Sequence, residues 1–566
     1  MPLDDLWPPF PTSRILHQDA DLVAIDKPPF LPTHAPERSD DVVRRLTEYF
    51  GSEGKTPGYL GVHQRLERDI SGVLVLTRRR EANRSIAEQM EQRKVKRTYL
   101  ALVTGTPGMP GRGKAPDYGV LRHRLVSISG AHRVLPATAR EGTPSTISFR
   151  VLERRGAFTL LALTPEPGCV IDLPAQLGAE GAPLVGDLER GGQTAHRLAL
   201  HLSDLVLTHP ENQRPLKIEA RMPTFFRDWL DGTDPLTHVN VAERRLREAA
   251  ERRLGIGRLA NTDCFRLANA EADGLPGVTV DRYGEYLVVS LYDEAAMAAR
   301  EVVFDAVMAL GAAGVYVKNR PKHASRIVDA HRDEFAPKTP VRGTAHPESF
   351  LIHELGLPFE VRLGDGLSTG IFLDQRENRR RVREMAKGLS VANLFAYTGA
   401  FSVAAAAGGA KSTLTVDVSP SVLEWAETNL RRIGADPAKH RVLEADVMKW
   451  LEHGAKKDGL FDLVILDPPS FATTKQSRFS AESDYKKLAA MAMRVLSPGG
   501  RLLACTNHKG IGPGKFRRVL QDAARDAGRT ISQIKDWPAP EDVPAEPGKD
   551  VQLKSVFVVL DGAARR

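Results

Sequence analysis

The stretch SVANLFAYTGAFSVAAAAGG (390–409) decides the fold of the C-terminal part of this 566-residue chain. Its apolar beginning predicts a strand, Gly399 predicts a tight turn, and the alanine-rich remainder predicts a helix. Strands and helices alternate regularly from about residue 346 onward, which is typical of a doubly wound parallel sheet. The turn lacks the complete G-x-G-x-x-G pattern, so it does not indicate a dinucleotide site.

Three aspartates follow at the ends of predicted strands. Asp417 ends the strand after the turn, about twenty residues on, at the spacing that lets an acidic residue bind ribose hydroxyls. Asp446 ends the next strand, and Asp467 ends the strand within FDLVILDPPSF (461–471). A single aspartate in such a place is more often a helix cap or turn former. The order of the three indicates instead that their carboxylates face one crevice at the strand ends.

The segment Asp-Pro-Pro-Ser-Phe (467–471) resembles motif IV of class I methyltransferases. Pro468 and Pro469 fix the backbone, which would aim the Asp467 side chain into a site. Phe471 would then stack on a base flipped out of its helix. The competing interpretation is a plain turn after a buried strand.

A longer resemblance covers roughly residues 245–562. The segments EADGLPGVTVDRYG (271–284), GIFLDQRENRR (370–380), NLFAYTGAF and DPPSF stand in the order found in the RlmI-like and RlmK-like ribosomal RNA methyltransferases. The resemblance implies S-adenosyl-L-methionine as cofactor and large-subunit ribosomal RNA as partner. No segment resembles the small RNA-binding (PUA) module of the RlmI-like members.

The same resemblance implies a set of cofactor-binding residues. Four would form the lip of the site, four would line its methionine end, Asp417 would bind the ribose, Asp446 the adenine amine, and Asp467 would complete the wall. The lip residues are Phe372, Asp374, Gln375 and Arg376, and the methionine-end residues are Asn393, Tyr397, Thr398 and Gly399.

The atom that accepts the methyl group depends on the segment GGRLLACTNHKG (499–510). Carbon-5 of cytosine is not nucleophilic and needs a cysteine thiolate to add to the ring first. Where RlmI-like members carry that cysteine, this chain has Asn507, which resembles the Asn-Asn-Lys of RlmK-like guanine-N7 enzymes. Guanine N7 has its own lone pair, so positioning by Asp467 and Asn507 would suffice. We therefore predict guanine N7.

Cys505 keeps a second possibility open. It lies inside the predicted strand, where a small buried hydrophobe is the common interpretation. Strand positions two apart share a face, so Cys505 and Asn507 would point to the same side. A 5-methylcytosine enzyme with Cys505 as nucleophile is the alternative.

Residues 14–230 resemble the RluA-like pseudouridine synthases. The resemblance rests on DADLVAIDKPPFLPTH (19–34), HQRLERDISGVLVLT (63–77), KRTYLALVTG (96–105) and LVGDLERGG followed by HRLALH (184–201). These segments stand in family order.

The synthase site looks degenerate. Glu67 stands where the family has its nucleophilic aspartate, and its extra methylene displaces the carboxylate. Pro174 stands where the family has the arginine that pairs with that aspartate, whereas Tyr99 matches the active-site tyrosine. We expect an inactive domain that holds RNA through basic segments such as 78–99. The alternative is that Glu67 still works and the protein is bifunctional.

Composition limits the classes of protein to which this chain can belong. The net charge of +8 suits a polyanionic partner, although a basic surface without nucleic acid fits it equally well. No apolar run approaches the ~20 residues that cross a bilayer, and MPLDDLWPPF lacks the pattern of a secretory signal. Cys169, Cys264 and Cys505 form no metal-ligand spacing. We expect a cytoplasmic protein with no membrane partner, no metal and no disulfide framework, and the oligomeric state stays open.

The predicted fold class is α/β with several domains. A pseudouridine-synthase-like α+β domain (1–232) precedes a basic linker helix (233–257), a small central α/β domain (258–345) and a Rossmann-like class I methyltransferase domain (346–566). The predicted function is S-adenosylmethionine-dependent methylation of a ribosomal RNA base. The alternative outside enzymes is an RNA-binding ribosome-assembly factor.

Overall fold

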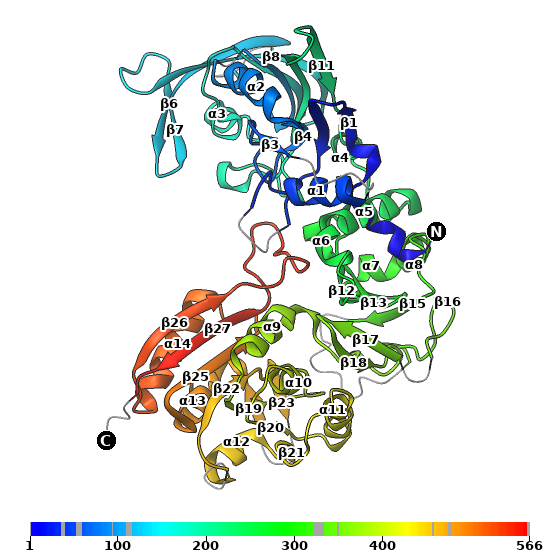
Figure 1. Ribbon diagram of the computed structural model, residues 1–566, viewed down its shortest axis with the longest axis vertical. Helices are drawn as coiled ribbons and strands as arrows, with labels where there is room; N and C mark the ends of the chain where they lie inside the picture. The colour runs from blue at the N-terminus through cyan, green and yellow to red at the C-terminus, as the bar shows by residue number, and fades with distance from the viewer. Residues whose placement is uncertain are drawn as a thin grey trace. The chain divides into compact units, whose positions relative to one another are not determined.

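The computed structural model divides the chain into two compact units (Figure 1). The N-terminal unit comprises Asp4–Pro235 and Ala250–Arg258, and the C-terminal unit comprises Leu236–Ala249, Leu259–Arg566 and the first three residues. The four-part division predicted above is finer than this and stays a prediction. The structure describes residues 2–35, 40–52, 59–92, 94–108, 116–320, 333–347, 350–454, 458–473 and 478–562.

The C-terminal unit contains a seven-stranded sheet in the order β21-β20-β19-β22-β25-β27-β26. The first five strands along this order run parallel, and β27 runs antiparallel to both its neighbours. The strand order reverses between β19 and β22, as in a doubly wound sheet, so the predicted fold class is confirmed. The strands are β19 (Ser390–Leu394), β20 (Ser412–Asp417), β21 (His440–Glu444), β22 (Phe461–Leu466), β25 (Leu496–Thr506), β26 (Ile531–Trp537) and β27 (Lys554–Leu560).

Helices cover both faces of this sheet because alternate strand residues are apolar on each side. In β22, Val464 and Leu466 pack in one cluster with residues of α13 and α14, whereas Leu463 and Ile465 pack in another with α9 and α10. The helices are α9 (Arg376–Met385), α10 (Ala400–Ala407), α11 (Pro420–Arg432), the short α12 (Val447–Lys449), α13 (Ala481–Arg494) and α14 (Pro513–Asp526).

A smaller sheet precedes the large one in the same unit. Its order is β12-β13-β14-β15-β16, and the hairpin β17–β18 follows it in sequence. Its elements are β12 (Cys264–Asn269), β13 (Val278–Tyr283), β14 (Tyr286–Leu291), α7 (Glu294–Ala298), α8 (Arg300–Met308), β15 (Gly314–Asn319), β16 (Arg342–Gly343), β17 (Phe350–Glu354) and β18 (Leu357–Val361). Helix α5 (Val239–Arg252), the predicted basic helix, is divided between the two units.

The N-terminal unit is built on one mixed sheet in the order β1-β2-β4-β10-β5-β9-β8-β6-β7, with β11 on β10 and β3 on β4. Its strands are β1 (Ile15–Gln18), β2 (Leu22–Lys27), β3 (Gly61–Val62), β4 (Ser71–Thr77), β5 (Lys96–Thr104), β6 (Tyr118–Ile128), β7 (Ala131–Pro136), β8 (Thr143–Arg155), β9 (Phe158–Pro165), β10 (Leu200–Thr208) and β11 (Pro215–Glu219). Its helices are α1 (Val42–Ser52), α2 (Arg80–Glu91), α3 (Leu173–Ala179), α4 (Thr224–Asp231) and α6 (Leu254–Gly257).

The three cysteines are free thiols, and two of them, Cys264 and Cys505, are buried. Among the described residues, no helix combines the length and the apolar composition needed to cross a membrane.

A buried ion pair holds α9 against the hairpin β17–β18. Arg379 donates through Nε and Nη2 to the two carboxylate oxygens of Glu354, at 2.7 and 2.6 Å, and both side chains are only 3% exposed. Arg379 also donates to the carbonyl oxygen of Phe372 at 2.8 Å. The pair therefore fixes the beginning of the segment that leads into α9.

We predict that Glu354→Ala destabilises the C-terminal unit by about 3–5 kcal/mol, because it leaves a buried guanidinium without its carboxylate. Urea unfolding followed by tryptophan fluorescence measures this. The matched control is Glu384→Ala, which removes the half-exposed partner of Arg380 on the same helix and should cost at most about 1 kcal/mol. Equal losses in the free energy of unfolding of the two variants would contradict a stabilising role of the buried Glu354–Arg379 pair.

Candidate functional site

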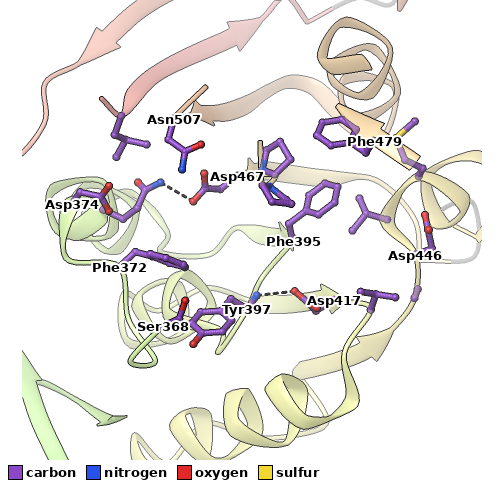
Figure 2. Close-up of a pocket in the computed structure, with 18 residues that line it drawn as sticks. Ser368, Phe372, Asp374, Phe395, Tyr397, Asp417, Asp446, Asp467, Phe479 and Asn507 are labelled. Carbon is purple, nitrogen blue, oxygen red and sulfur yellow. Dashed lines mark hydrogen bonds between the residues drawn. The ribbon is translucent and has the colours of Figure 1, made fainter. Parts of the chain in front are cut away.

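A cavity of about 320 Å³ opens at the carboxyl ends of the parallel strands in the C-terminal unit (Figure 2). Its position at the reversal of strand order is where doubly wound sheets bind ligands. The lining residues are Ser368, Phe372, Asp374, Gln375, Phe395, Tyr397, Asp417, Val418, Ala445, Asp446, Val447, Met448, Asp467, Pro468, Pro469, Phe479, Asn507 and Leu553. The three strand-end aspartates thus come together, as the sequence pattern predicts.

The loop between β19 and α10 forms one wall of the cavity. Phe395 and Tyr397 adopt positive φ angles of 57° and 51°, and Gly399 follows with 74°. Left-handed conformations are costly for bulky residues, and such strain concentrates at functional sites. At Gly399 a Cβ atom would lie 2.8 Å from the Cβ of Ala426, so the close approach of α11 requires glycine.

This loop is tied to the strand end next to it by Asp417. The amide of Tyr397 donates to one carboxylate oxygen of Asp417 at 2.9 Å, and the amide of Ser419 donates to the other at 3.1 Å (Figure 2). Each oxygen keeps capacity for a further hydrogen bond. Asp417 is therefore a rigid acceptor for a polyol such as a ribose.

Asp446 serves two purposes at the end of β21. It lines the cavity, and its side chain accepts the amide of Lys449 at 3.3 Å as the N-cap of α12. Asp446 is therefore a helix cap, as strand-end aspartates often are, and it also lines the cavity wall.

Asp467 and Asp374 form the polar end of the cavity. Gln375 donates through Nε2 to the carboxylate of Asp467 at 2.7 Å (Figure 2). Burial, with the nearby charge of Asp374, raises the pKa of Asp467 to about 7, against the opposing effects of Gln375 and Arg379. Burial likewise raises the pKa of Asp374.

The charge of the wall suits a cationic ligand. The described lining residues include the four carboxyl groups of Asp374, Asp417, Asp446 and Asp467 but no lysine or arginine. S-adenosylmethionine carries a sulfonium and an ammonium group, and such cations are attracted strongly inside a partly desolvated acidic site. The phenyl rings of Phe395 and Phe479 add apolar surface for a heterocycle. The residues present therefore fit this cofactor.

Four of the residues predicted to hold the cofactor do not line the cavity. Arg376 forms a buried ion pair with Asp542. Asn393 donates to Ser402 at 3.1 Å, the hydroxyl of Thr398 donates to the carbonyl of Gly370, and Gly399 forms the turn that begins α10. In this structure these four shape the framework behind the wall, and their direct contact with a cofactor stays a prediction.

Several lining residues were missed by the sequence reasoning. Phe395 lies within the segment NLFAYTGAF, two residues before the predicted site residue Tyr397, so this motif could have indicated it. Phe479 precedes α13 and Leu553 precedes β27, in segments without any motif. Only the tertiary structure brings these two to the cavity.

Cys505 does not reach the cavity. It is 0% exposed in β25 and faces the α9 side of the sheet, where its sulfur lies 3.6 Å from Ser555 Oγ and 3.8 Å from Gln375 Oε1. Burial raises the pKa of its thiol, which disfavours the thiolate that a nucleophile needs. Asn507, beyond the strand end, does line the cavity.

Ser470 and Phe471 follow directly after the lining residue Pro469. The hydroxyl of Ser470 donates to Oδ1 of Asn507 at 2.7 Å. Phe471 begins the short strand β23 (Phe471–Thr473), is 55% exposed and contacts the ring of His508 edge-on at 5.6 Å. Phe471 is thus available for stacking although it does not line the cavity itself.

The residues predicted to form a degenerate synthase site lie in the N-terminal unit. Tyr99 on β5 is 6% exposed, and burial raises its pKa. Pro174 lies in the first turn of α3, whose N-cap Asp172 accepts the amide of Ala175 at 3.0 Å. Desolvation and the charges of Asp172 and Asp69 raise the pKa of Glu67, with Arg190 and His132 opposing. The carboxylates of Asp172 and Asp69 and the cation of Arg190 thus all act on Glu67, although position 174 holds a proline and not an arginine.

Some basic side chains of the segment 78–99 have partners within the N-terminal unit. Arg79 pairs with Asp21, Arg84 pairs with Glu88 at 2.9 Å, and Arg97 donates to the sulfur of Met90 at 3.2 Å. Two of its arginines, Arg79 and Arg84, are therefore ion-paired within the unit.

One group of side chains in the described part of the N-terminal unit has the spacing of metal ligands: His17, Asp19 and His209. Asp19 Oδ2 lies 2.6 Å from His17 Nε2 and 2.9 Å from His209 Nε2. Nδ1 of His209 accepts the amide of Glu211 at 3.2 Å, so its proton sits on Nε2 and faces Asp19. Hydrogen bonds between Asp19 and the two histidines therefore explain why these three side chains lie close together.

Comparison with known proteins agrees with the two units. The model of the S-adenosylmethionine-dependent methyltransferase family matches residues 269–554, and that of RNA pseudouridylate synthases matches residues 21–169. The chain is 37% identical to a putative ribosomal RNA large subunit methyltransferase of Bacillus subtilis over 301 residues, 53% of this chain and 74% of that protein. It is 35% identical to the ribosomal RNA large subunit methyltransferase I of Aliivibrio fischeri, over 54% of this chain and 76% of that protein.

Solved structures give the same result. A putative methyltransferase in complex with SAH is 26% identical, with a TM-score of 0.51 over 63% of this chain and 88% of the other. A putative S-adenosylmethionine-dependent methyltransferase from Streptococcus mutans is 25% identical, with a TM-score of 0.50 over the same shares. The chain therefore belongs to the S-adenosylmethionine-dependent methyltransferase family, has S-adenosylmethionine as its cofactor, and carries an RNA-pseudouridylate-synthase-like domain in its N-terminal part.

Proposed function

We propose that this enzyme methylates a base of large-subunit ribosomal RNA, and that the acceptor atom is N7 of guanine. The names of the curated relatives support the substrate class. One observation supports N7 as the acceptor atom: at the end of β25, Asn507 lines the cavity. Among the described residues, Cys505 is the only thiol near this strand end, and it is buried outside the cavity. A ring nitrogen reacts without a covalent catalyst, whereas carbon-5 of cytosine does not.

The cofactor supplies an activated methyl group on a cationic sulfur. When the N7 lone pair forms the new N–C bond, the C–S electron pair stays on sulfur and the positive charge moves to the purine ring. An ionised Asp467 beside the base stabilises that developing charge.

Asn507 provides selectivity for guanine. Its oxygen accepts the hydroxyl of Ser470, so its Nδ2 group is left as a donor at the cavity (Figure 2). Guanine presents the acceptors O6 and N7 on one edge, whereas adenine presents a donor beside N7. Phe471, which is exposed two residues after the lining residue Pro469, stacks on the flipped base.

The N-terminal unit, in our proposal, is an inactive synthase that orients the RNA. Replacement of the arginine by Pro174 and of the aspartate by Glu67 removes the pair that the family uses, and burial with the charges of Asp172 and Asp69 raises the pKa of Glu67. The match to RNA pseudouridylate synthases supports a surface shaped for folded RNA.

Nucleoside mass spectrometry of ribosomal RNA, from cells with and without the gene, tests the proposal. We expect one 7-methylguanosine to disappear, with its position mapped by reverse transcription. Loss of a 5-methylcytidine would instead indicate Cys505 as nucleophile, and loss of a pseudouridine would indicate an active Glu67. An unchanged RNA would favour a ribosome-assembly factor that no longer uses its cofactor.

We predict that Asn507→Ala lowers kcat for RNA methylation by roughly 10–100-fold, because the base loses a charge-neutral donor in a partly desolvated site. Cys505→Ser should stay within about threefold of the wild type, since a nucleophilic role would cost orders of magnitude. Transfer of a radiolabelled methyl group to unmodified ribosomal RNA measures both. A reversed pattern would contradict the guanine-N7 proposal.

We predict that Asp417→Ala weakens S-adenosylmethionine binding by about 10–100-fold, because hydrogen bonds to a charged group are lost. Isothermal titration calorimetry with the full chain measures the Kd. The control Asp436→Ala removes an aspartate that caps the backbone beyond α11, away from the cavity lining, and should leave the Kd unchanged. Equal affinities of Asp417→Ala and the wild type would show that this carboxylate does not hold the ribose.

A further inference from the structure

Behind the cavity wall, a chain of buried amides and a hydroxyl leads away from Asp467. Gln375 ends the helical turn η6 (Leu373–Gln375) and donates to Asp467 at 2.7 Å. Asn378 on α9 donates through Nδ2 to Oε1 of Gln375 at 2.6 Å and to Oγ of Ser555 on β27 at 2.8 Å. The side chains of Gln375, Asn378 and Ser555 are 2%, 3% and 5% exposed, so water cannot replace a lost partner easily.

The partners fix which way each amide faces. A carboxamide has one accepting oxygen and one donating nitrogen, and it can turn over within the same space. The oxygen of Gln375 faces the amide nitrogen of Asn378, so its nitrogen must face Asp467. Asn378 is fixed in turn by Arg381, whose Nη1 can only donate and lies 3.5 Å from Oδ1 of Asn378. The Nδ2 group of Asn378 is then left to donate to the hydroxyl of Ser555.

We propose that Asn378 and Ser555 are positioning residues for methyl transfer: they keep the N–H group of Gln375 turned toward Asp467, which holds that carboxylate ionised beside the reacting base. Neither residue lines the cavity. They therefore act through Gln375 and not by touching cofactor or RNA. The inference rests on the proposed function for the role of Asp467.

The charges around Asp467 show why this hydrogen bond matters. Asp374 faces it from η6, Arg379 from α9, the Cys505 thiol from β25 and the Tyr485 hydroxyl from α13. Burial and Asp374 favour the neutral acid, whereas Gln375 and Arg379 favour the carboxylate. Because the pKa of Asp467 is raised to about 7, a small change at Gln375 alters the ionised fraction near neutral pH.

The test is the pH profile of methyl transfer by the full chain. The reaction requires ionised Asp467, so the rate falls as the pH drops through its pKa. Loss of a donor to the carboxylate raises that pKa, and we expect Asn378→Ala to move the acid limb of kcat/KM upward by about one pH unit. Asn378→Asp, which presents an acceptor to Gln375 and turns its amide over, should move the limb at least as far. An unmoved limb in both variants would overturn the proposal.

A double-mutant cycle separates positioning from general damage. Gln375→Met removes the donor itself and should shift the acid limb as Asn378→Ala does. In that background Asn378→Ala should add nothing, because no amide remains to be oriented. An additive further shift would show that Asn378 acts independently of Gln375 and would overturn the proposal.

Ser555 supplies the second variant if Asn378→Ala does not fold. Ser555→Ala removes an acceptor of Asn378 and should shift the limb in the same direction, whereas Ser555→Thr keeps the hydroxyl and should restore the wild-type profile. Thermal unfolding and calorimetric titration with S-adenosylmethionine check that each variant is folded. A wild type without any methyl transfer to ribosomal RNA would refute the proposed function, whereas an active wild type with unmoved variants would refute only this inference.

Discussion

The parallel register of β19, β20 and β22 is the constraint on which the site depends. Leu394 lies beside Val416 in one neighbouring strand and beside Leu466 in the other. Because the three strands run in one direction and end at one level, the residues that follow them emerge at one edge of the sheet. Asp417 ends one of these strands and Asp467 directly follows another, which places both on the cavity wall.

The acidity of this edge has a chemical consequence. Carboxylates grouped in a partly desolvated site repel one another, and an opposing charge or a donor must compensate. In the described part of the cavity wall no basic residue does so. Arg379 and Gln375, which reach Asp467 from α9 and the turn before it, supply part of the compensation, and a cationic cofactor supplies more. The same charges that would destabilise the empty site therefore favour the cofactor that the family uses.

The two units differ in how their residues match the site patterns of the families that they resemble. In the C-terminal unit the polar residues of the site remain organised by buried partners, such as the amide of Asn378 behind Gln375. In the N-terminal unit Asp172 is the N-cap of α3, and Pro174 lies in its first turn, at the position where the resemblance places the arginine of the synthase site. In our proposal, the fold of a synthase persists there without the charge pair of its site, and the domain is retained for its shape.

The sequence by itself determined the doubly wound fold and most of the cavity wall. Strand-end aspartates such as Asp417 and the turn at Gly399 could be read locally, because their positions follow from strand period and from the order of the elements. The tertiary structure decided what local pattern cannot: that Cys505 faces α9, that Arg376 is bound to Asp542, and that Phe479 and Leu553 complete the wall. Each of these depends on contacts between segments far apart in the chain, and sequence spacing carries no information about such contacts.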